Sequence, residues 1–490
     1  MNQQLTLLDA AFLYVETKHS PMHIAGLLIL EVPAERRPTF FAEMRRYIAE
    51  RAPTVAFMTR RLVASALDLD HPHWETVDRL DIDHHVRQLV LAEPGSIAQL
   101  EDLVAALHAE PLDRSRPLWQ SYLIEGVEGD KIAWYTKIHH ACIDGVAGQV
   151  LLEVFGSLTP DDAPIGAKAA DVAAPRWSDR WARAVAQSAL QPINALTAVG
   201  EGLRTFRQLA RRASDRESFG AYAQRAPRTR FNHAIGAGRS FTVGTLSLRE
   251  VKAFGEAHGC NVNDVFLAVC AGGLRKYLSD LGELPAEPLI AGVPVSLREL
   301  GDHSMSNRVT MMLASLETQQ ADALARLTSI CDSTRTGKAI VRATSRSMPQ
   351  DVHVLGLPLA VRSVVASIEA LGLTDRLRLP INLVISNIPG PRRAVFIHGA
   401  RMLTHYPVSA PVHGCALNIT VQSYQDRLDF SLTACRGALP DGHKLRDDML
   451  AAWQELKGLV PDTTDAKRNE SKAPSRRSAA NAVGEIAAPV

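Results

Sequence analysis

Apolar positions along the chain follow two periods, and these periods divide it into two α/β regions. Short apolar runs bounded by turn residues predict buried strands, and apolar residues spaced three or four apart predict amphipathic helices. In the first region we expect strands at Ala25–Val32, Leu118–Glu125 and Lys131–His139, and helices at Pro38–Ala52, Ile97–Leu107 and Gly145–Leu158. Strands and helices therefore mix without an internal repeat.

The same two periods return in the second half of the chain. They predict strands at Arg239–Leu248, Leu289–Pro294, Arg308–Leu316, Ile381–Ser386, Ala416–Ser423 and Arg427–Ala434, and helices at Leu248–His258, Asn263–Leu278 and Leu445–Leu456. The tail is rich in Ser, Ala, Lys, Arg and Pro, which predicts disorder. The predicted organisation is an N-terminal domain over 1–158, a connector over 159–230, a C-terminal domain over 231–460 and a disordered tail over 461–490.

Composition narrows the class of protein. The chain has 490 residues, 46% hydrophobic and 22% charged, and a net charge of +1, which is typical of a globular protein and gives no overall signature of nucleic-acid binding. Its six cysteines show no C-x-x-C spacing, so we expect reduced thiols and a cytosolic setting. No apolar run predicts a transmembrane helix, and Asp9 interrupts the N-terminal apolar stretch, which argues against a signal peptide. Any membrane association is expected to be peripheral.

The connector has a charge of its own. Its Arg176–Arg230 segment contains eleven Arg, no Lys and four acidic residues, a net charge of +7. Apolar positions in the same segment mark helix faces. A bridging helical segment with a solvated basic face and a helix resting on an anionic lipid surface both fit this pattern.

The densest chemical cluster is Ile138–Gly145, which reads Ile-His-His-Ala-Cys-Ile-Asp-Gly. It lies between a predicted strand and a predicted helix, where functional sites are commonly built. Adjacent strand residues point to opposite faces, so only one of His139 and His140 can face a given cleft. An imidazole titrates near neutrality and suits general-base work on a hydroxyl. Asp144 could orient the histidine or pair with a distant arginine.

Other chemical interpretations of these residues are weaker. The second pair, His84-His85, is not followed by Asp-Gly, and we expect it to be structural. A metal site built from the cluster's two histidines and Asp144 is disfavoured, because consecutive strand residues do not converge on one ion. Cys142 could be a nucleophile, but a small buried cysteine is the commoner case. The chain has no G-x-S-x-G, P-loop or Gly-rich dinucleotide motif, which disfavours a serine hydrolase and a nucleotide-binding enzyme.

Together with its companions, the cluster resembles the bacterial wax ester synthase/acyl-CoA:diacylglycerol acyltransferase family of the CoA-dependent acyltransferase superfamily. Six motifs occur in the family's order, over nearly the whole chain before the tail. They are an opening motif with Asp9, Phe12, Glu16 and Pro21-Met22-His23; a P-L-W element with Asp113, Arg116 and Pro117-Leu118-Trp119; His139–Gly145 as H-H-x-x-x-D-G; Asn263-Asp264; the strand end Pro294–Arg298; and Ser386–Pro391 as S-N-x-P-G-P.

The resemblance implies an α/β fold of two chloramphenicol acetyltransferase-like domains that form a central substrate tunnel. It also implies acyl transfer from acyl-CoA to a hydroxyl of diacylglycerol or a long-chain alcohol, without an acyl-enzyme, a cofactor or a metal. His140 is then the expected general base, with His139 supporting it and Gly145 in its loop. Asp144 is expected to pair with Arg298, so its role would be structural.

The remaining candidate residues each have two interpretations. The candidates for substrate or oxyanion binding are Asn263, Asp264, Ser386, Asn387 and Trp119. The Asn-Asp pair could instead cap the helix that begins there, the Ser-Asn segment could be a turn, and the tryptophan could pack in the core. Diacylglycerol, monoacylglycerol and long-chain alcohols remain alternative acceptors.

Two other functions fit parts of the pattern. One is an acyltransferase of the same superfamily that takes its acyl group from a carrier-protein phosphopantetheine arm. The opening motif and the late S-N-x-P-G-P motif favour acyl-CoA over this donor. The other is a non-catalytic lipid-surface protein, against which the intact His140–Gly145 motif argues. We expect a cytoplasmic protein, peripherally associated with the inner membrane or lipid droplets, with acyl-CoA and an acceptor lipid as partners and no nucleic acid.

Overall fold

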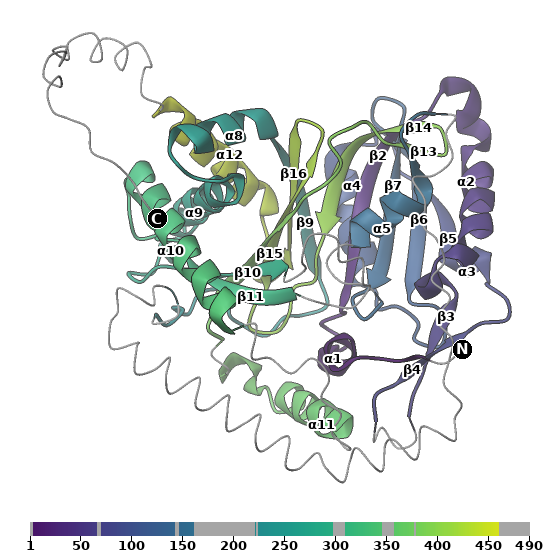
Figure 1. Cartoon of the computed structure of the whole chain (residues 1–490), viewed down its shortest axis with the longest axis horizontal. Helices are drawn as coiled ribbons and strands as arrows, with labels where there is room; N and C mark the ends of the chain where they lie inside the picture. Colours follow the sequence, from purple (N-terminus) through teal and green to yellow (C-terminus); the bar gives the residue numbers. More distant parts are fainter. Residues whose placement is uncertain are drawn as a thin grey trace, which may run out of the picture.

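Two mixed sheets dominate the fold, which was obtained as a computed structural model (Figure 1). The structure describes residues 3–65, 70–142, 147–160, 221, 224–296, 309–344, 357–376 and 379–459. The predicted tail, most of the predicted connector, and the segments that hold Asp144, Gly145 and Arg298 therefore lie outside the described residues. The mixed α/β class expected from the sequence is confirmed.

The N-terminal sheet has seven strands in the order β5-β6-β7-β2-β14-β13-β8. Their bounds are β5 Val86–Val90, β6 Trp119–Val127, β7 Lys131–His139, β2 His23–Glu31, β14 Ala400–Val408, β13 Phe396–Ile397 and β8 Gly156–Ser157. The helices of this half are α1 Leu7–Val15, α2 Arg37–Arg51, α3 Ile82–His85, α4 Ile97–Ala109 and α5 Ala147–Phe155. A small sheet with the order β1-β4-β3 lies beside them, with β1 Gln3–Gln4, β4 His73–Thr76 and β3 Arg60–Val63.

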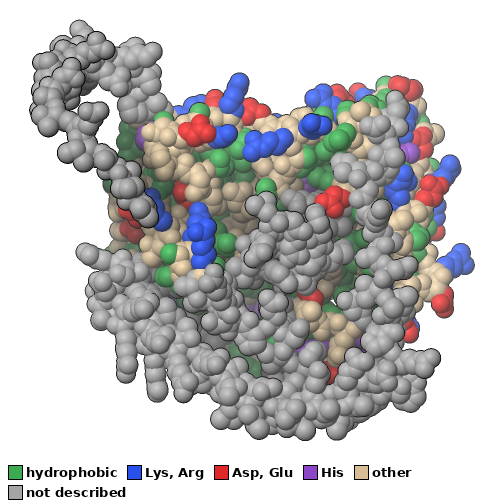
Figure 2. Space-filling view, in the orientation of Figure 1, with side chains coloured by type: hydrophobic (Ala, Val, Ile, Leu, Met, Phe, Trp, Pro, Cys, Tyr) green, Lys and Arg blue, Asp and Glu red, His purple; other side chains and the backbone are tan. Residues whose placement is uncertain are grey.

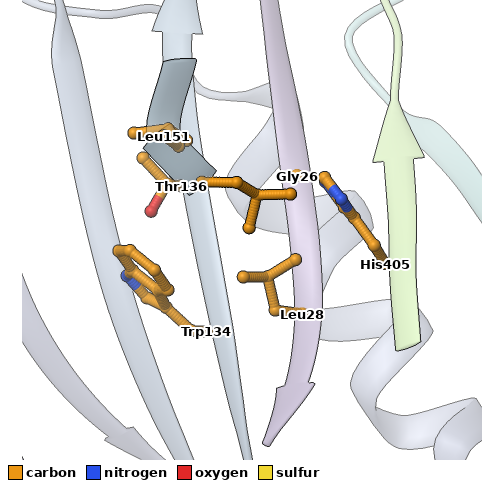
Figure 3. A pocket seen from close by; sticks show the side chains of 7 residues that line it. Gly26, Leu28, Trp134, Thr136, Leu151 and His405 are labelled. Carbon is orange, nitrogen blue, oxygen red and sulfur yellow. The ribbon is translucent and has the colours of Figure 1, made fainter. Parts of the chain in front are cut away.

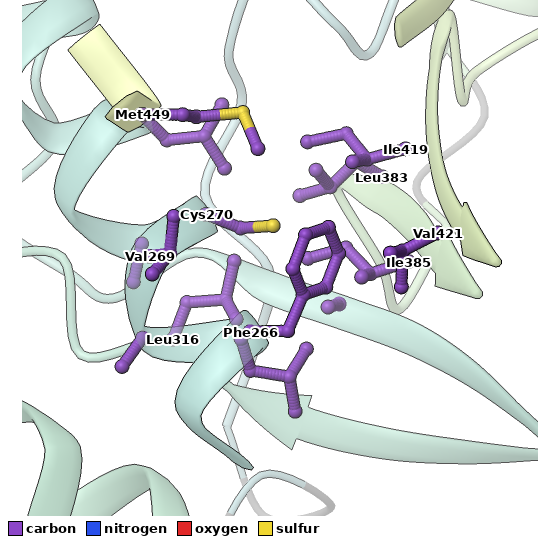
Figure 4. Close-up of a cluster of buried hydrophobic side chains, with 14 of the residues drawn as sticks. Phe266, Val269, Cys270, Leu316, Leu383, Ile385, Ile419, Val421 and Met449 are labelled. Atoms are coloured by element: carbon purple, nitrogen blue, oxygen red, sulfur yellow. The ribbon is translucent and has the colours of Figure 1, made fainter. Parts of the chain in front are cut away.

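The C-terminal sheet has six strands in the order β11-β10-β12-β15-β16-β9. Their bounds are β11 Val309–Ser315, β10 Ile290–Ser296, β12 Leu383–Ile388, β15 Leu417–Tyr424, β16 Arg427–Cys435 and β9 Arg239–Ser247. The helices are α8 Leu248–Ala257, α9 Val262–Asp280, α10 Ala323–Thr344, α11 Leu357–Ala370 and α12 Gly442–Gly458. Figure 4 shows how Phe266 and Cys270 of α9 pack against Ile385, Ile419 and Val421 of the sheet, which makes the core of this half.

Most predicted elements lie within two or three residues of the observed ones, and β7 has the predicted bounds. The helix expected at Gly145–Leu158 ends earlier, because its last residues pair as β8 with β13. Several observed elements were not anticipated: the helices α1, α3, α10 and α11, and the strands β1, β3, β4, β5, β8, β13 and β14. Among the described residues, no helix has the length and apolar character needed to cross a membrane.

The cysteines correct one expectation. Cys260 and Cys331 form a disulfide that ties the segment before α9 to α10, so the prediction of reduced thiols throughout is wrong for this pair. Their Cα atoms lie 6.3 Å apart, within the usual range for a bridge. The free cysteines of the structure are Cys142, Cys270, Cys415 and Cys435.

A buried carboxylate joins the two halves of the molecule. Glu101 on α4 is 3% exposed, and its Oε1 accepts a hydrogen bond of 2.7 Å from the Val243 amide on β9. Its Oε2 lies 2.6 Å from His443 Nε2 on α12. Because β9 is an edge strand, this carboxylate pairs an amide that the C-terminal sheet leaves open.

Replacing Glu101 by Ala should lower the free energy of unfolding by about 1–3 kcal/mol, because the buried Val243 amide loses its acceptor. Chemical denaturation at neutral pH measures the loss. The matched control is Asp102→Ala, which removes the neighbouring acid, 80% exposed in its side chain and 3.6 Å from Arg436. A surface pair of that kind contributes about 0–1 kcal/mol. An equal loss of unfolding free energy in the two variants would contradict the proposed role of Glu101 in joining the two halves.

Candidate active site

Strand β7 is an inner strand of the N-terminal sheet; it ends at His139, and His140 follows directly. His139 pairs with His23 of β2, and the amide of His140 donates a 2.8 Å hydrogen bond to the Met22 carbonyl. The chain then turns, with the Cys142 amide donating to the His139 carbonyl at 2.9 Å. Adjacent strand residues face opposite ways, so the two imidazoles are directed to different surroundings.

His139 points into the protein, toward a buried acid. It is 1% exposed, and its Nδ1 accepts a 3.0 Å hydrogen bond from the Ala141 amide, which places its proton on Nε2. That Nε2 atom lies 3.4 Å from Glu16 Oε1. Glu16 also accepts a 2.9 Å hydrogen bond from the Met22 amide and forms an ion pair with Arg114.

Glu16 is strongly held in its ionised form. Burial by itself would raise the pKa of Glu16, but the hydrogen bond and charge of His139, with Arg114 and the Met22 amide, lower it to about 2. A neutral carboxylic acid would lose the ion pair while remaining buried. The carboxylate therefore stabilises the backbone segments on both sides of the histidine pair.

His140 faces the other way and is only half-buried. The Phe12 ring stacks on its imidazole, with ring centroids 3.9 Å apart and an angle of 13° between the planes. Its Nδ1 is buried without a hydrogen-bond partner among the described residues. Burial lowers the pKa of His140 to about 4, an effect that its own carbonyl opposes and the charge of His139 reinforces. The imidazole is therefore neutral at pH 7.

A buried polar cluster lies on the opposite face of β7, next to α4. His23 Nε2 is 2.8 Å from the His108 carbonyl oxygen, and the Lys137 ammonium donates to the Leu107 and Glu110 carbonyls, each at 2.8 Å. Backbone carbonyls thus satisfy these side chains. The cluster fixes β7 against α4 and leaves the His140 face as the one open to substrate chemistry.

Asp264 lies at the start of α9 and serves as part of a helix cap. Asn261 is the N-cap residue, its side chain accepts from the Asp264 amide at 3.1 Å, and Asp264 Oδ2 lies 2.6 Å from Asn261 Nδ2. Asp264 Oδ1 accepts a 2.8 Å hydrogen bond from Thr334 on α10. These contacts favour the capping interpretation. Asn263 is half-buried in the same first turn.

Trp119 is a core residue, and its assignment to substrate binding is corrected. Its side chain is 1% exposed, its indole nitrogen donates to the Met58 carbonyl at 3.0 Å, and the His85 ring stacks on it at 4.4 Å. No surface of the indole is left for a ligand. The same contact confirms that His85 is structural.

Ser386 and Asn387 lie in β12, paired with Thr420 and Val421 of β15, and both are half-buried. The turn after them is tight, because a Cβ atom at Gly390 would meet the Ser423 carbonyl oxygen at 2.1 Å. The structure therefore places this motif at the end of a C-terminal strand. Among the described residues, no hydrogen bond or ring contact joins these two side chains to His140.

A small apolar cavity lies on the face of the N-terminal sheet that α5 covers. Its lining is Gly26, Leu28, Trp134, Thr136, Leu151, Leu152 and His405. Figure 3 shows the His405 ring reaching from β14 toward Gly26 of β2. The space has room for about one water molecule, so it is too small for a long-chain substrate. We interpret it as a packing gap.

A role for Cys142 as a nucleophile is disfavoured at this site. Burial raises the pKa of the Cys142 thiol well above its usual range, with a smaller effect from Asp9 on α1. A thiol that stays protonated is a poor nucleophile.

Some contact residues could not be found from the sequence. Phe12 and Glu16 belong to the opening motif, yet nothing in their spacing shows that one stacks on His140 and the other faces His139. Arg114 was not singled out at all. The sequence places Glu16 and Arg114 within the stretches of two short motifs. These two residues, which contact each other in the fold, are 98 positions apart in the chain.

Comparisons with known proteins agree with this geometry. Residues 5–266 match the wax ester synthase/diacylglycerol acyltransferase catalytic domain, and residues 305–457 match the WS/DGAT C-terminal domain. O-acyltransferase WSD of Acinetobacter baylyi is 33% identical over 472 residues, which cover 94% of this chain and 98% of the relative. The solved wax ester synthase/diacylglycerol acyltransferase from Marinobacter aquaeolei VT8 is 30% identical, with a TM-score of 0.68 over 93% of this chain and 99% of that one.

More distant structures define the class of fold. The first condensation domain of the calcium-dependent antibiotic synthetase has a TM-score of 0.54 over 94% of this chain and 97% of that one, at 15% identity, which shows the fold alone. The fold is therefore one that condensation domains share. The chain belongs to the wax ester synthase/diacylglycerol acyltransferase family and is an acyltransferase.

The Glu16 network predicts a pH-dependent loss of stability in Glu16→Gln. A pKa lowered from 4.5 to about 2 corresponds to about 3 kcal/mol of stability at neutral pH. Because the folded pKa is the lower one, this contribution is present above pH 4.5 and is lost as the pH falls toward 2. Urea unfolding of both proteins at pH 7, 4.5 and 3 should give a difference that shrinks with acidity. A difference independent of pH would contradict the assigned charge.

Proposed function

We propose that the protein transfers an acyl group from acyl-CoA to the hydroxyl of diacylglycerol, and also to long-chain alcohols. Membership of the family supports an acyl donor and an acyl acceptor as substrates. The observation that carries the proposal is the state of His140: a half-buried imidazole with Nδ1 enclosed, whose pKa is lowered to about 4 by burial, so that it is neutral at pH 7. Such a group suits general-base catalysis.

In the proposed reaction, His140 Nε2 takes the proton of the acceptor hydroxyl as that oxygen attacks the thioester carbonyl. The new C–O bond forms, the C–S bond breaks, and the imidazolium returns the proton to the CoA thiolate. No acyl-enzyme is needed, because the thioester is already activated. General acid–base catalysis contributes about 10²–10⁴-fold, and alignment of the two substrates and stabilisation of the oxyanion supply the rest.

The supporting roles are proposed from the motifs. Asn263, Ser386 and Asn387 are candidates for orienting substrate or stabilising the oxyanion. An Asp144–Arg298 pair would fix the histidine loop relative to the C-terminal half; both residues lie outside the described residues. His139 supports the site through its contact with Glu16.

His140→Ala should lower turnover by about 10²-fold or more while the protein stays folded and binds acyl-CoA. His139→Ala should keep more turnover but lose about 1–3 kcal/mol of stability, because Glu16 loses a buried partner. The measurement is release of free CoA from palmitoyl-CoA, with diacylglycerol, hexadecanol or no acceptor. The control is His84→Ala, in the structural histidine pair. Near wild-type turnover in His140→Ala would overturn the proposal.

We also propose that the protein works at a lipid surface, since its proposed acceptors are insoluble. On the face shown in Figure 2, the visible described side chains mix basic and acidic types, so a basic surface would have to come from the Arg176–Arg230 segment with its net charge of +7. Each basic residue near an anionic membrane contributes about 1 kcal/mol.

Vesicle flotation tests this surface. The protein should float with phosphatidylserine-containing vesicles at low salt, and less of it should float as salt rises, because ionic strength screens the attraction. Neutral phosphatidylcholine vesicles are the control. Absence of binding to anionic vesicles at low salt would remove the proposal.

A further inference from the structure

Helix α1 touches the proposed catalytic histidine in two ways. Its residue Phe12 covers the His140 ring, at 3.9 Å between centroids and 13° between planes. Its C-cap residue Glu16 accepts from the Met22 amide at 2.9 Å, and the Met22 carbonyl in turn accepts from the His140 amide at 2.8 Å. The helix therefore contacts the His140 ring directly and is linked to the His140 backbone through Met22.

The backbone contact alone does not set the direction of the ring. An imidazole turns about two side-chain bonds, and among the described residues its Nδ1 has no normal hydrogen-bond partner to hold it. A nearly parallel aromatic ring in contact with one face leaves the imidazole little freedom to tilt. The stacking contact is thus the structural feature that defines the plane of His140.

We propose that Phe12 is a positioning residue for acyl transfer: its ring holds the His140 imidazole with Nε2 toward the substrate and shields one imidazole face from water. The inference rests on the proposed general-base role of His140 and goes beyond it, since it assigns a task to a residue that touches no reacting atom.

Helix α1 is built to keep Phe12 in place. The Thr6 hydroxyl caps its start by accepting from the Asp9 amide at 3.2 Å. Its end is anchored by Glu16 through Met22, Arg114 and His139. A helix of nine residues would be marginal alone, so these end contacts are what fix the position of the ring.

Shielding has an electrostatic consequence. Burial is the main cause that lowers the pKa of His140 to about 4. Among the described residues, His139 of β7 is the titratable group whose charge acts on His140. Asp9 acts on the neighbouring Cys142, and Glu16 lies beside His139 and forms an ion pair with Arg114. Removing the Phe12 ring admits water to one face, so the pKa of His140 should rise toward its ordinary value of about 6.5.

The test is the pH profile of kcat for Phe12→Leu between pH 4 and 8, with palmitoyl-CoA and diacylglycerol. A general base must be neutral, so activity falls as the pH drops through its pKa. In Phe12→Leu this acidic limb should move to higher pH by about 1 unit or more, and kcat at the plateau should fall by about 10- to 100-fold. The KM for palmitoyl-CoA should stay within about 3-fold. Phe12→Tyr should restore both the limb and the rate.

The matched control is Tyr14→Leu on the same helix. Tyr14 stacks on His71, a histidine of no proposed chemical role, with centroids 5.9 Å apart and an angle of 19°. This variant loosens α1 to a similar degree but should leave the acidic limb unmoved. An equal shift in Tyr14→Leu would show that only the stability of α1 matters, and a Phe12→Leu profile like wild type would overturn the proposal.

A second readout does not depend on turnover. Diethyl pyrocarbonate modifies neutral, accessible imidazoles, and mass spectrometry can follow its addition to His140. At pH 7, Phe12→Leu should be modified several-fold faster than wild type, and its rate should titrate at a higher pH. If wild type releases no CoA, the proposed function fails while this measurement still tests the positioning of the ring. Equal modification rates in both proteins would reject the positioning role.

Discussion

The active site depends on a strand that the C-terminal half contributes to the N-terminal sheet. Strand β14 pairs with β2, and β2 pairs with β7, the strand that ends in the two histidines. Without β14, β2 would be an edge strand with unpaired backbone groups. A contact with the C-terminal sheet holds β14 in this position. The buried Asp429 of β16 accepts a 3.0 Å hydrogen bond from the amide of His405 in β14. The sheet that presents His140 is therefore complete only when both halves of the chain have folded together.

This dependence explains what the sequence could and could not predict. Local periodicity found β7, β15 and β16 because apolar residues recur along each strand and turns bound them. It missed β14, whose pattern is broken by Pro407 and by a register shift between Met402 and Thr404. No local pattern could show that its partner is β2, since strand pairing over several hundred residues is decided by packing. The resemblance identified Phe12 and Glu16 as motif residues, but only the fold shows which histidine each one contacts.

Neighbouring residues at the end of β7 face opposite sides of the sheet, where one side has structural contacts and the other has the proposed chemical role. On the α4 face, His139 meets an ionised acid and Lys137 is fully buried with its ammonium bonded to two carbonyls. Burial lowers the pKa of Lys137 to about 8, an effect that the charge of Glu110 opposes, so this buried amine still carries its charge at neutral pH. These contacts are costly to disturb and make the strand rigid. On the other face, His140 stacks on Phe12, and its Nδ1 has no hydrogen-bond partner among the described residues.

A catalytic base can be oriented by a hydrogen bond or by packing, and the described residues favour packing. A carboxylate bonded to His140 would stabilise the imidazolium and raise its pKa, as in a triad. Here the carboxylate in contact with the pair, Glu16, lies beside His139 and is neutralised by Arg114. The ring of His140 meets Phe12, which restrains it without adding charge. In the proposed reaction the imidazolium passes its proton to the CoA thiolate. The ordinary pKa of a thiol, about 8.5, lies above that of histidine, about 6.5, so this transfer is favourable without a carboxylate beside His140.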